Sequence, residues 1–134
     1  EKGEFNNVWV AGNLIVSNGK YYIHPVGNVV NVKNELGRII VMHEVIPDTI
    51  CQCTGLKDRN GNLIWENDIV KFDVYYYEKL QSSIISQIKW CNALCALSLV
   101  VNGRGTRGTL GHLIDLNKSI EVIGNIFDNP ELLK

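Results

Sequence analysis

Long hydrophobic runs are missing from this sequence. No apolar stretch approaches the ~20 residues that a membrane-spanning helix needs, and no signal-peptide hydrophobic region is present. These absences argue against a membrane segment, and we therefore expect a cytoplasmic protein.

A predominance of one charge is missing as well. The 134 residues carry 13 basic and 14 acidic side chains, which gives a formal net charge of -1. This balance argues against a strongly basic nucleic-acid binder, although a local basic patch is compatible with it. Apolar residues make up 46% of the chain and charged residues 20%, so the composition is that of a globular protein rather than a disordered tail.

Known catalytic and metal-binding motifs are also absent. The histidines His24, His43 and His112 are dispersed, and neither a His-Glu-x-x-His motif nor a nucleophile elbow occurs. The carboxylates at Asp58, Glu66 and Asp68 adjoin predicted turns, where acidic side chains commonly bind nearby backbone N–H groups. We therefore predict no catalytic residue, no cofactor and no metal. A small hydrolase or nuclease built from dispersed acids and histidines is the least favoured hypothesis.

The four cysteines do not have the spacing of a structural zinc site. Zinc ligands usually come in pairs about two to four residues apart on tight knuckles. Here Cys51 and Cys53 alternate with one residue inside a predicted strand, and Cys91 and Cys95 lie in another apolar segment. We expect all four to be reduced and free of metal.

Turn residues between apolar runs indicate β-hairpins. An Asn-Gly pair supplies the positive φ angles of a tight turn, and Asn60-Gly61 has apolar residues on both sides. Residues 8–16 and 21–24 are predicted strands joined by a turn at residues 17–20. In the run 69–74, alternation places Val70, Phe72 and Val74 on one face.

The second half of the chain continues this pattern. We predict strands at residues 84–90, 93–101 and 121–126. Residues 75–83 are predicted to be a connection, although three consecutive tyrosines could extend the preceding strand. Residues 102–108 hold three glycines in seven positions and are predicted to form a flexible loop.

Short strands and frequent turns are typical of small barrels, and no helical period of useful length is present. We predict a mainly β fold, in which an N-terminal β-meander merges with an SH3-like β-barrel. Asn129 and Pro130 fit the start of a short C-terminal helical turn. The expected organisation is a single domain, 1–134, with residues 1–50 as the meander subdomain and residues 51–134 as the barrel part.

Several of these segments, taken in order, resemble the YopX family of phage and prophage proteins. The opening strand, residues 9–15, also looks like that of the family. The main matching segments are Pro47-Asp48-Thr49, Gln52-Cys53-Thr54-Gly55-Leu56, Asn60-Gly61, Glu66-Asn67-Asp68-Ile69-Val70, Val122-Ile123-Gly124-Asn125-Ile126 and Asn129-Pro130-Glu131-Leu132-Leu133.

The resemblance implies a β-rich, barrel-like fold, a prophage setting and self-association, and it implies no established activity or catalytic residue. Cys53 stands where the family often has an aromatic residue, which favours a packing role for this thiol. Asn67 stands where the family usually has Gly, and Asn tolerates a left-handed backbone well, so we expect a positive φ there. We interpret the motif residues as structural: Gly55, Asn60, Gly61, Asn67, Asp68, Gly124 and Pro130.

Two local features suggest binding. Arg104, Thr106 and Arg107 lie in the glycine-rich segment and form a candidate phosphate-binding loop, although the P-loop motif is absent and a solvated hairpin tip is the simpler interpretation. An alternative nucleic-acid surface would use Lys89 with stacking by Tyr75 and Tyr77.

We predict a non-enzymatic phage or prophage accessory protein that binds a protein partner or assembles with itself. We expect a homo-oligomer, with a host or phage protein as a further partner. A nucleic-acid-binding small β-barrel is the alternative.

Overall fold

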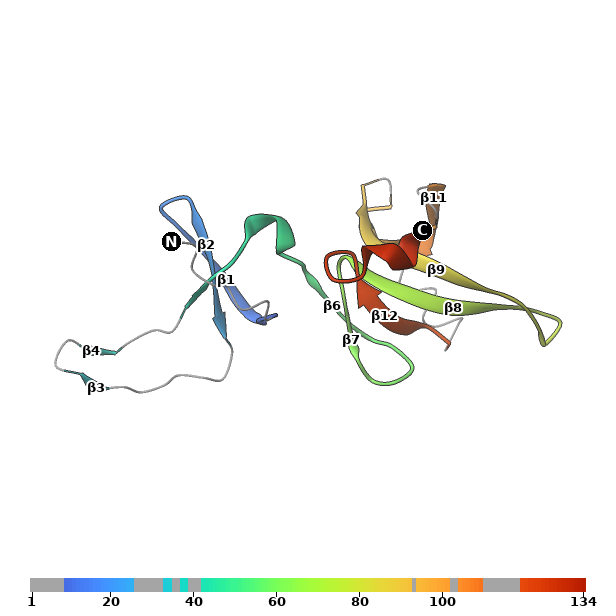
Figure 1. The fold of residues 1–134 in the computed structure, drawn as a ribbon, viewed down its shortest axis with the longest axis horizontal. Coiled ribbons are helices and arrows are strands. Elements are labelled where there is room, and N and C mark those ends of the chain that lie inside the picture. Colours follow the sequence, from blue (N-terminus) through green and yellow to red (C-terminus); the bar gives the residue numbers. More distant parts are fainter. Residues whose placement is uncertain are drawn as a thin grey trace. The chain divides into compact units, whose positions relative to one another are not determined.

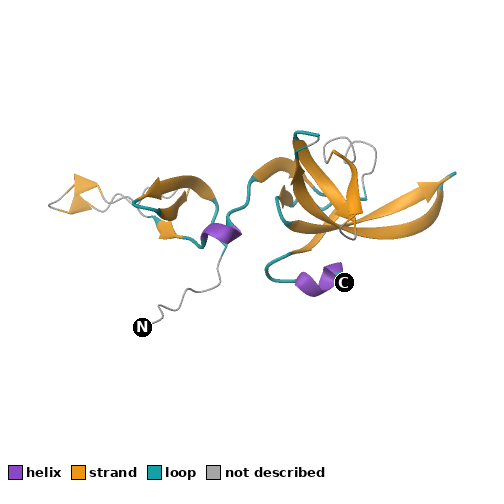
Figure 2. Cartoon of the chain, turned by 90° about the horizontal axis from the view of Figure 1, so that it is seen from above, coloured by secondary structure: helices purple, strands orange, loops and turns teal. Residues whose placement is uncertain are grey.

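The computed structural model describes residues 9–25, 33–34, 37–38, 42–92, 94–101, 104–109 and 119–134. The described part is mainly β, as predicted, and its helical elements are two short 3₁₀ turns (Figure 2). The chain divides into two compact units, Glu1–Ile50 and Cys51–Lys134.

A three-stranded antiparallel sheet forms the first unit (Figure 1). Its strands lie in the order β1 (Gly12–Ser17), β2 (Lys20–Pro25) and β5 (His43–Glu44). A separate two-residue ladder joins β3 (Lys33–Asn34) to β4 (Gly37–Arg38), and the 3₁₀ turn η1 covers Pro47–Thr49.

The β1–β2 hairpin follows from its sequence. Its two-residue turn, Asn18-Gly19, has φ angles of 50° and 72°, which Asn and Gly adopt more readily than other residues. Gly12 lies so close to the carbonyl of His24 that a Cβ at this position would overlap the β2 backbone. The predicted turn at residues 17–20 is therefore confirmed.

The first unit has little core of its own. None of the side chains that the structure describes in this unit is buried, and Leu14 and Val16 are 48% and 58% exposed. A sheet of this size needs an apolar face that is covered in order to be stable in water.

The second unit is built on a five-stranded antiparallel sheet. Its strand order is β11-β10-β9-β8-β12, in which β8 and β9 form the central hairpin. A smaller hairpin of two strands precedes the sheet. The strands of this unit are β6 (Cys53–Lys57), β7 (Leu63–Trp65), β8 (Asp68–Tyr76), β9 (Lys79–Cys91), β10 (Ala96–Val101), β11 (Arg104–Thr109) and β12 (Glu121–Asn125).

The core of this unit lies on one face of the sheet. As alternation predicts, Val70 and Phe72 are buried and Val74 packs against them. Ile64 of β7 is fully buried in the same cluster, so the small hairpin packs against the large sheet. The remaining buried members are Ile88, Leu99 and Ile120.

The C-terminal residues fold back on β12. Asn125 donates its backbone N–H to Oδ1 of Asn129 at 3.4 Å, and Gly124 leaves the room that this side chain occupies. The 3₁₀ turn η2 (Pro130–Leu133) follows, and the Asn129 side chain makes no capping hydrogen bond to it. This side chain therefore fastens the loop to the strand rather than capping the turn.

No sheet of the described residues closes into a barrel. The five-stranded sheet ends at β11 on one side and at β12 on the other. The SH3-like barrel therefore stays a prediction.

The predicted loop at residues 102–108 is wrong for the part that the structure describes, because Arg104–Thr109 forms strand β11. Val101 pairs with Arg104, Val100 with Thr106, and the register shifts between these pairs. Such shifts are β-bulges, which glycine accommodates easily, so the glycine-rich sequence suits an irregular strand. Asn102 and Gly103 lie outside the described residues.

The predicted connection at residues 75–83 is also wrong. Strand β8 continues to Tyr76 and β9 begins at Lys79, so only Tyr77 and Glu78 form the turn. The φ angles of these two residues are 47° and 61°. This turn has the left-handed backbone of Asn18-Gly19 without Asn or Gly, and hence without the usual sequence signal.

We expect Glu78→Gly to raise the free energy of unfolding by about 1 kcal/mol, because glycine removes the strain of a side chain at positive φ. Lys79→Gly, one residue further along in regular strand, should lower it by a similar amount. Thermal and denaturant unfolding measure both. Equal destabilisation by the two variants would contradict this turn geometry.

Candidate functional site

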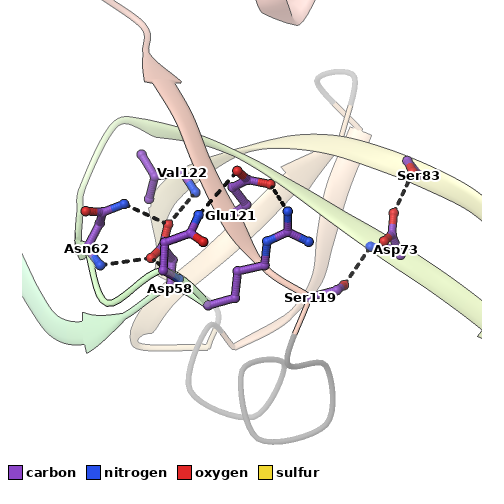
Figure 3. A network of polar contacts seen from close by, with 9 residues as sticks. Asp58, Asn62, Asp73, Ser83, Ser119, Glu121 and Val122 are labelled. Atoms are coloured by element: carbon purple, nitrogen blue, oxygen red, sulfur yellow. Dashed lines mark hydrogen bonds and ion pairs between the residues drawn. The ribbon is translucent and has the colours of Figure 1, made fainter.

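Asp58 accepts hydrogen bonds from two separate parts of the second unit (Figure 3). It is only 7% exposed, in the turn between β6 and β7. Its Oδ1 accepts the backbone N–H groups of Asn60 and Asn62, both at 2.9 Å. Its Oδ2 accepts the N–H of Val122 in β12 at 3.0 Å. One side chain thus shapes the turn and fastens it to a distant strand.

These hydrogen bonds determine the charge state of Asp58. Burial raises the pKa of its carboxyl group, but the N–H donors from Val122, Asn62 and Asn60 outweigh burial and hold the pKa below its usual range. Both carboxylate oxygens are engaged by backbone donors, and an ionised acid of this kind is poorly suited to proton transfer.

A second contact reinforces the same junction. The Arg59 guanidinium lies 2.7 Å from Glu121 Oε2, and the Arg59 backbone N–H donates to the carbonyl of Ile120 at 2.9 Å. Asn60 Nδ2 donates to the other oxygen of Glu121 at 3.3 Å. The acidic and basic groups here connect the turn to β12, and their arrangement is structural.

The turn between β7 and β8 depends on Asn67. Its φ is 69°, which confirms the predicted positive angle. Its backbone N–H donates to the carbonyl of Ile88 at 2.8 Å, and its Oδ1 accepts from Gln87 Nε2 at 3.1 Å. Its Nδ2 donates to Cys51 Sγ at 3.5 Å. Asn67 therefore contributes hydrogen bonds that the family's glycine could not make.

Two titratable groups lie around this turn. Half-burial raises the pKa of Asp68 to about 6, while the N–H of Trp65, 2.8 Å from its Oδ2, lowers the pKa and the charge of Asp58 raises it. Burial also raises the pKa of the Cys51 thiol, against the hydrogen bond from Asn67. A thiol shifted in this direction is a weak nucleophile.

In the described ranges, the cysteines and the other residues of metal-binding type do not form a metal site. None of the four cysteines is in a disulfide. No group of three or more His, Cys, Asp or Glu able to hold a metal ion occurs among the residues that the structure places.

The family motif residues are explained by backbone geometry. Gly55 and Gly61 have φ angles of 73° and 82°. Next to Gly55, the register between β6 and β7 shifts. There, Thr54 Oγ1 donates to the carbonyl of Ile64 in β7 at 2.6 Å and accepts the N–H of Leu56 in its own strand. The motif therefore specifies how the small hairpin packs.

The predicted binding residues lie on several different elements. Arg104, Thr106 and Arg107 belong to β11, and their side chains lie outside what the structure describes. Lys89 pairs with Ser98 in the central part of the sheet, whereas Tyr77 occupies the hairpin turn. Roughly 30 Å of strand separates Lys89 from that turn. Backbone alone is described for Tyr75.

The outer part of the β8–β9 hairpin, residues 72–86, has no described strand paired beside it, and its far end reaches past the rest of the sheet (Figure 1). We call residues 72–86 the arm. Described pairing of β12 with β8 ends at Lys71, and that of β10 with β9 ends at Gln87. Near the base of the arm, Asp73 accepts the hydroxyl of Ser83, and its N–H donates to Ser119 Oγ at 2.9 Å (Figure 3).

The tip of the arm is aromatic and exposed. Tyr77 is 84% exposed, Tyr76 65% and Leu80 57%. The rings of Tyr76 and Tyr77 pack edge to face, with centroids 4.5 Å apart. A register shift leaves Gln81 as an extra residue in β9 just behind the tip. The tip thus exposes two packed tyrosine rings, whereas Leu80, which pairs with Tyr75, lies on the face opposite to Tyr76.

Sequence reasoning missed this tip and the bond from Asp58 to Val122. The run Tyr75-Tyr76-Tyr77 was assigned to a connection, with an extended strand as the alternative, and the turn after it has neither Gly nor Asn to mark its position. Asp58 was interpreted as an ordinary turn residue, which its bonds to Asn60 and Asn62 confirm. Its second role, as the acceptor of the Val122 N–H, depends on β12, which is far away in the sequence.

Within the described segments, no helix is long and apolar enough to cross a membrane.

The geometry defines a mainly β protein of two units, whose polar clusters hold turns and strands together. A comparison with protein families matches residues 4–134 to the YopX family, described as YopX protein. Because the match covers nearly the whole chain, the protein belongs to the YopX family. No curated protein matches the sequence.

Asp58→Ala should lower the free energy of unfolding of the second unit by about 3 kcal/mol, because it leaves several backbone N–H groups without their acceptor. Asp58→Asn keeps one acceptor oxygen and should lose less. Glu131→Ala removes an exposed carboxylate of the same unit and should change stability by less than about 0.5 kcal/mol. Chemical denaturation measures all three, and similar losses for Asp58→Ala and Glu131→Ala would contradict the assignment.

Asp68→Asn should change how stability depends on pH. The folded pKa of about 6 exceeds that of an unfolded Asp, so the fold favours the protonated acid and loses stability as pH rises from about 4 through about 6. Asparagine does not titrate. The stability of the variant relative to the parent should therefore increase over this window and level off near neutral pH. Denaturation across this pH range tests it, and a constant difference would show that Asp68 does not titrate there.

Proposed function

We propose that the protein is a non-enzymatic phage accessory protein that acts by binding other proteins, including a second copy of itself. The observation that carries the proposal is the exposed tip of the arm, where the packed rings of Tyr76 and Tyr77 project from the hairpin. Tyrosine supplies a large contact area at low cost in side-chain entropy and is enriched at binding hot spots.

The turn chemistry supports a role for these side chains. The β1–β2 hairpin of the same chain makes the same kind of two-residue turn with Asn18-Gly19. At the arm tip, Tyr77 and Glu78 hold similar angles, although residues other than Gly and Asn are less stable there by roughly 1 kcal/mol each. Strain at an exposed tip is consistent with side chains that function by contact.

The charges at the tip favour a protein partner over nucleic acid. Glu78 and Lys79 are adjacent and opposite in sign. Nucleic-acid affinity depends on several cations near the phosphates, and this tip offers one. An apolar, neutral groove on a partner protein fits the tip better.

The polar clusters support a non-enzymatic role. Asp58 and Asp68 both accept backbone N–H groups at turns, and the Cys51 thiol has a raised pKa. A hydrolase or nuclease would need acids free to bind water or a cation.

The SH3-like barrel is also part of the proposal. Its support is the packing of Ile64, from the small hairpin, into the core of the five-stranded sheet. We also propose a phage or prophage origin, from the family resemblance, and a cytoplasmic location, from the absence of long apolar runs in the sequence.

Affinity capture with the tagged full chain, from host cells that carry the phage, tests the proposal. Tyr77→Asn with Glu78→Gly removes the aromatic tip and keeps a favourable turn, whereas Glu78→Gly alone keeps Tyr77 and serves as the matched control. A captured partner should bind the control as it binds the parent, and the double variant about 30-fold more weakly, as expected when a tyrosine hot spot is lost.

The same capture can also contradict the proposal. Partners that bind all three proteins equally would place the contact elsewhere. Salt-sensitive, sub-micromolar binding of short oligonucleotides (on the order of 0.1 μM), lost in Arg104→Ala with Arg107→Ala, would instead favour the alternative of a nucleic-acid-binding barrel.

A further inference from the structure

The outer edge of β1 is open among the described strands of the first unit. The sheet order places β1 at one end, with β2 as its neighbour. Leu14 and Val16 lie on the same face of β1, opposite Ile23 and Tyr21 of β2. Leu14 and Val16 are about half exposed, so this apolar face is only partly covered.

We propose that β1 pairs antiparallel with β1 of a second copy, so that the two N-terminal sheets become one continuous sheet about a two-fold axis. A register centred on Ile15 sets Leu14 of one copy beside Val16 of the other. The two apolar faces then join on one side of the sheet. This inference rests on the self-association in the proposed function and names its surface.

The low burial of the first unit supports a second copy as the occupant. With no buried side chain among those described, and with β5 only two residues long, the unit is close to an isolated β1–β2 hairpin. Isolated hairpins are marginally stable in water. Pairing across β1 gives four full-length strands and doubles the apolar face.

The charges of the unit also fit self-pairing. No residue of β1 is charged, so antiparallel pairing sets no like charges opposite each other. The nearest described charges, Lys20 and Glu44, form an ion pair with each other at 3.2 Å. Edge strands that avoid pairing usually carry a charge, a proline or a bulge, and β1 has none of these.

Light scattering on the full chain, over a wide concentration range, is the first test. The parent should give twice 15.1 kDa, about 30 kDa. Val16→Lys places two like charges beside the axis and should give the monomer mass. Ile46→Lys is the matched control, since Ile46 is 59% exposed against 58% for Val16 and lies outside the sheet. This control should keep the dimer mass.

Hydrogen exchange provides a measurement that does not depend on a variant. Amides of β1 and β2 should exchange about tenfold more slowly at high protein concentration than at low, whereas those of β8 and β9 should not change.

The outcomes separate this inference from the proposed function. A parent that is monomeric throughout, with exchange independent of concentration, overturns both the β1 pairing and self-association, and leaves partner binding by the arm in place. An oligomer that persists in Val16→Lys, or that dissociates equally in Ile46→Lys, overturns the β1 surface alone.

Discussion

The second unit depends on one carboxylate. Asp58 orders the turn between β6 and β7 through the N–H groups of Asn60 and Asn62, and through Val122 it fastens that turn to β12. Together with the contacts of Arg59 and Asn60 to Glu121, this bond supplies the polar link between the small hairpin and the edge strand. Because the carboxylate is nearly buried and accepts three backbone N–H groups as well as the side-chain amide of Asn62, its position is tightly fixed. The packing of Ile64 into the core follows from that position.

The two units differ in what stabilises them. The second encloses a core around Val70, Phe72 and Ile88 and holds its turns with polar side chains. The first has well-formed turns, such as Asn18-Gly19, with little buried surface beneath them. Local chemistry therefore specifies the hairpin of the first unit, whereas the described residues of that unit supply few buried contacts to stabilise it. Association with another chain would supply further buried contacts for this unit.

Sequence reasoning succeeded where the information was local. The positive φ of Asn67 was predictable because the family that the sequence resembles usually has Gly there and Asn tolerates the same backbone, and the buried face of β8 because alternation reveals it. Reasoning failed where the sheet overrides local preference. The glycines of β11 are typical of loops, yet pairing with β10 and bulges accommodate them. Tyr77 and Glu78 make a turn that neither residue favours, because the two strands beside them fix the backbone. The link from Asp58 to Val122 joins residues too far apart for any local pattern to reveal.

The place of β12 in the sheet has a consequence for synthesis. This strand comes near the end of the chain, and its neighbour β8 was made some 50 residues earlier. Until β12 leaves the ribosome, the edge of β8 at Ile69 and Val70 has no strand beside it and Asp58 lacks the N–H of Val122. The second unit can therefore complete its fold only once β12 has been made, and until then its nascent form exposes an apolar strand edge to chaperones and to neighbouring chains.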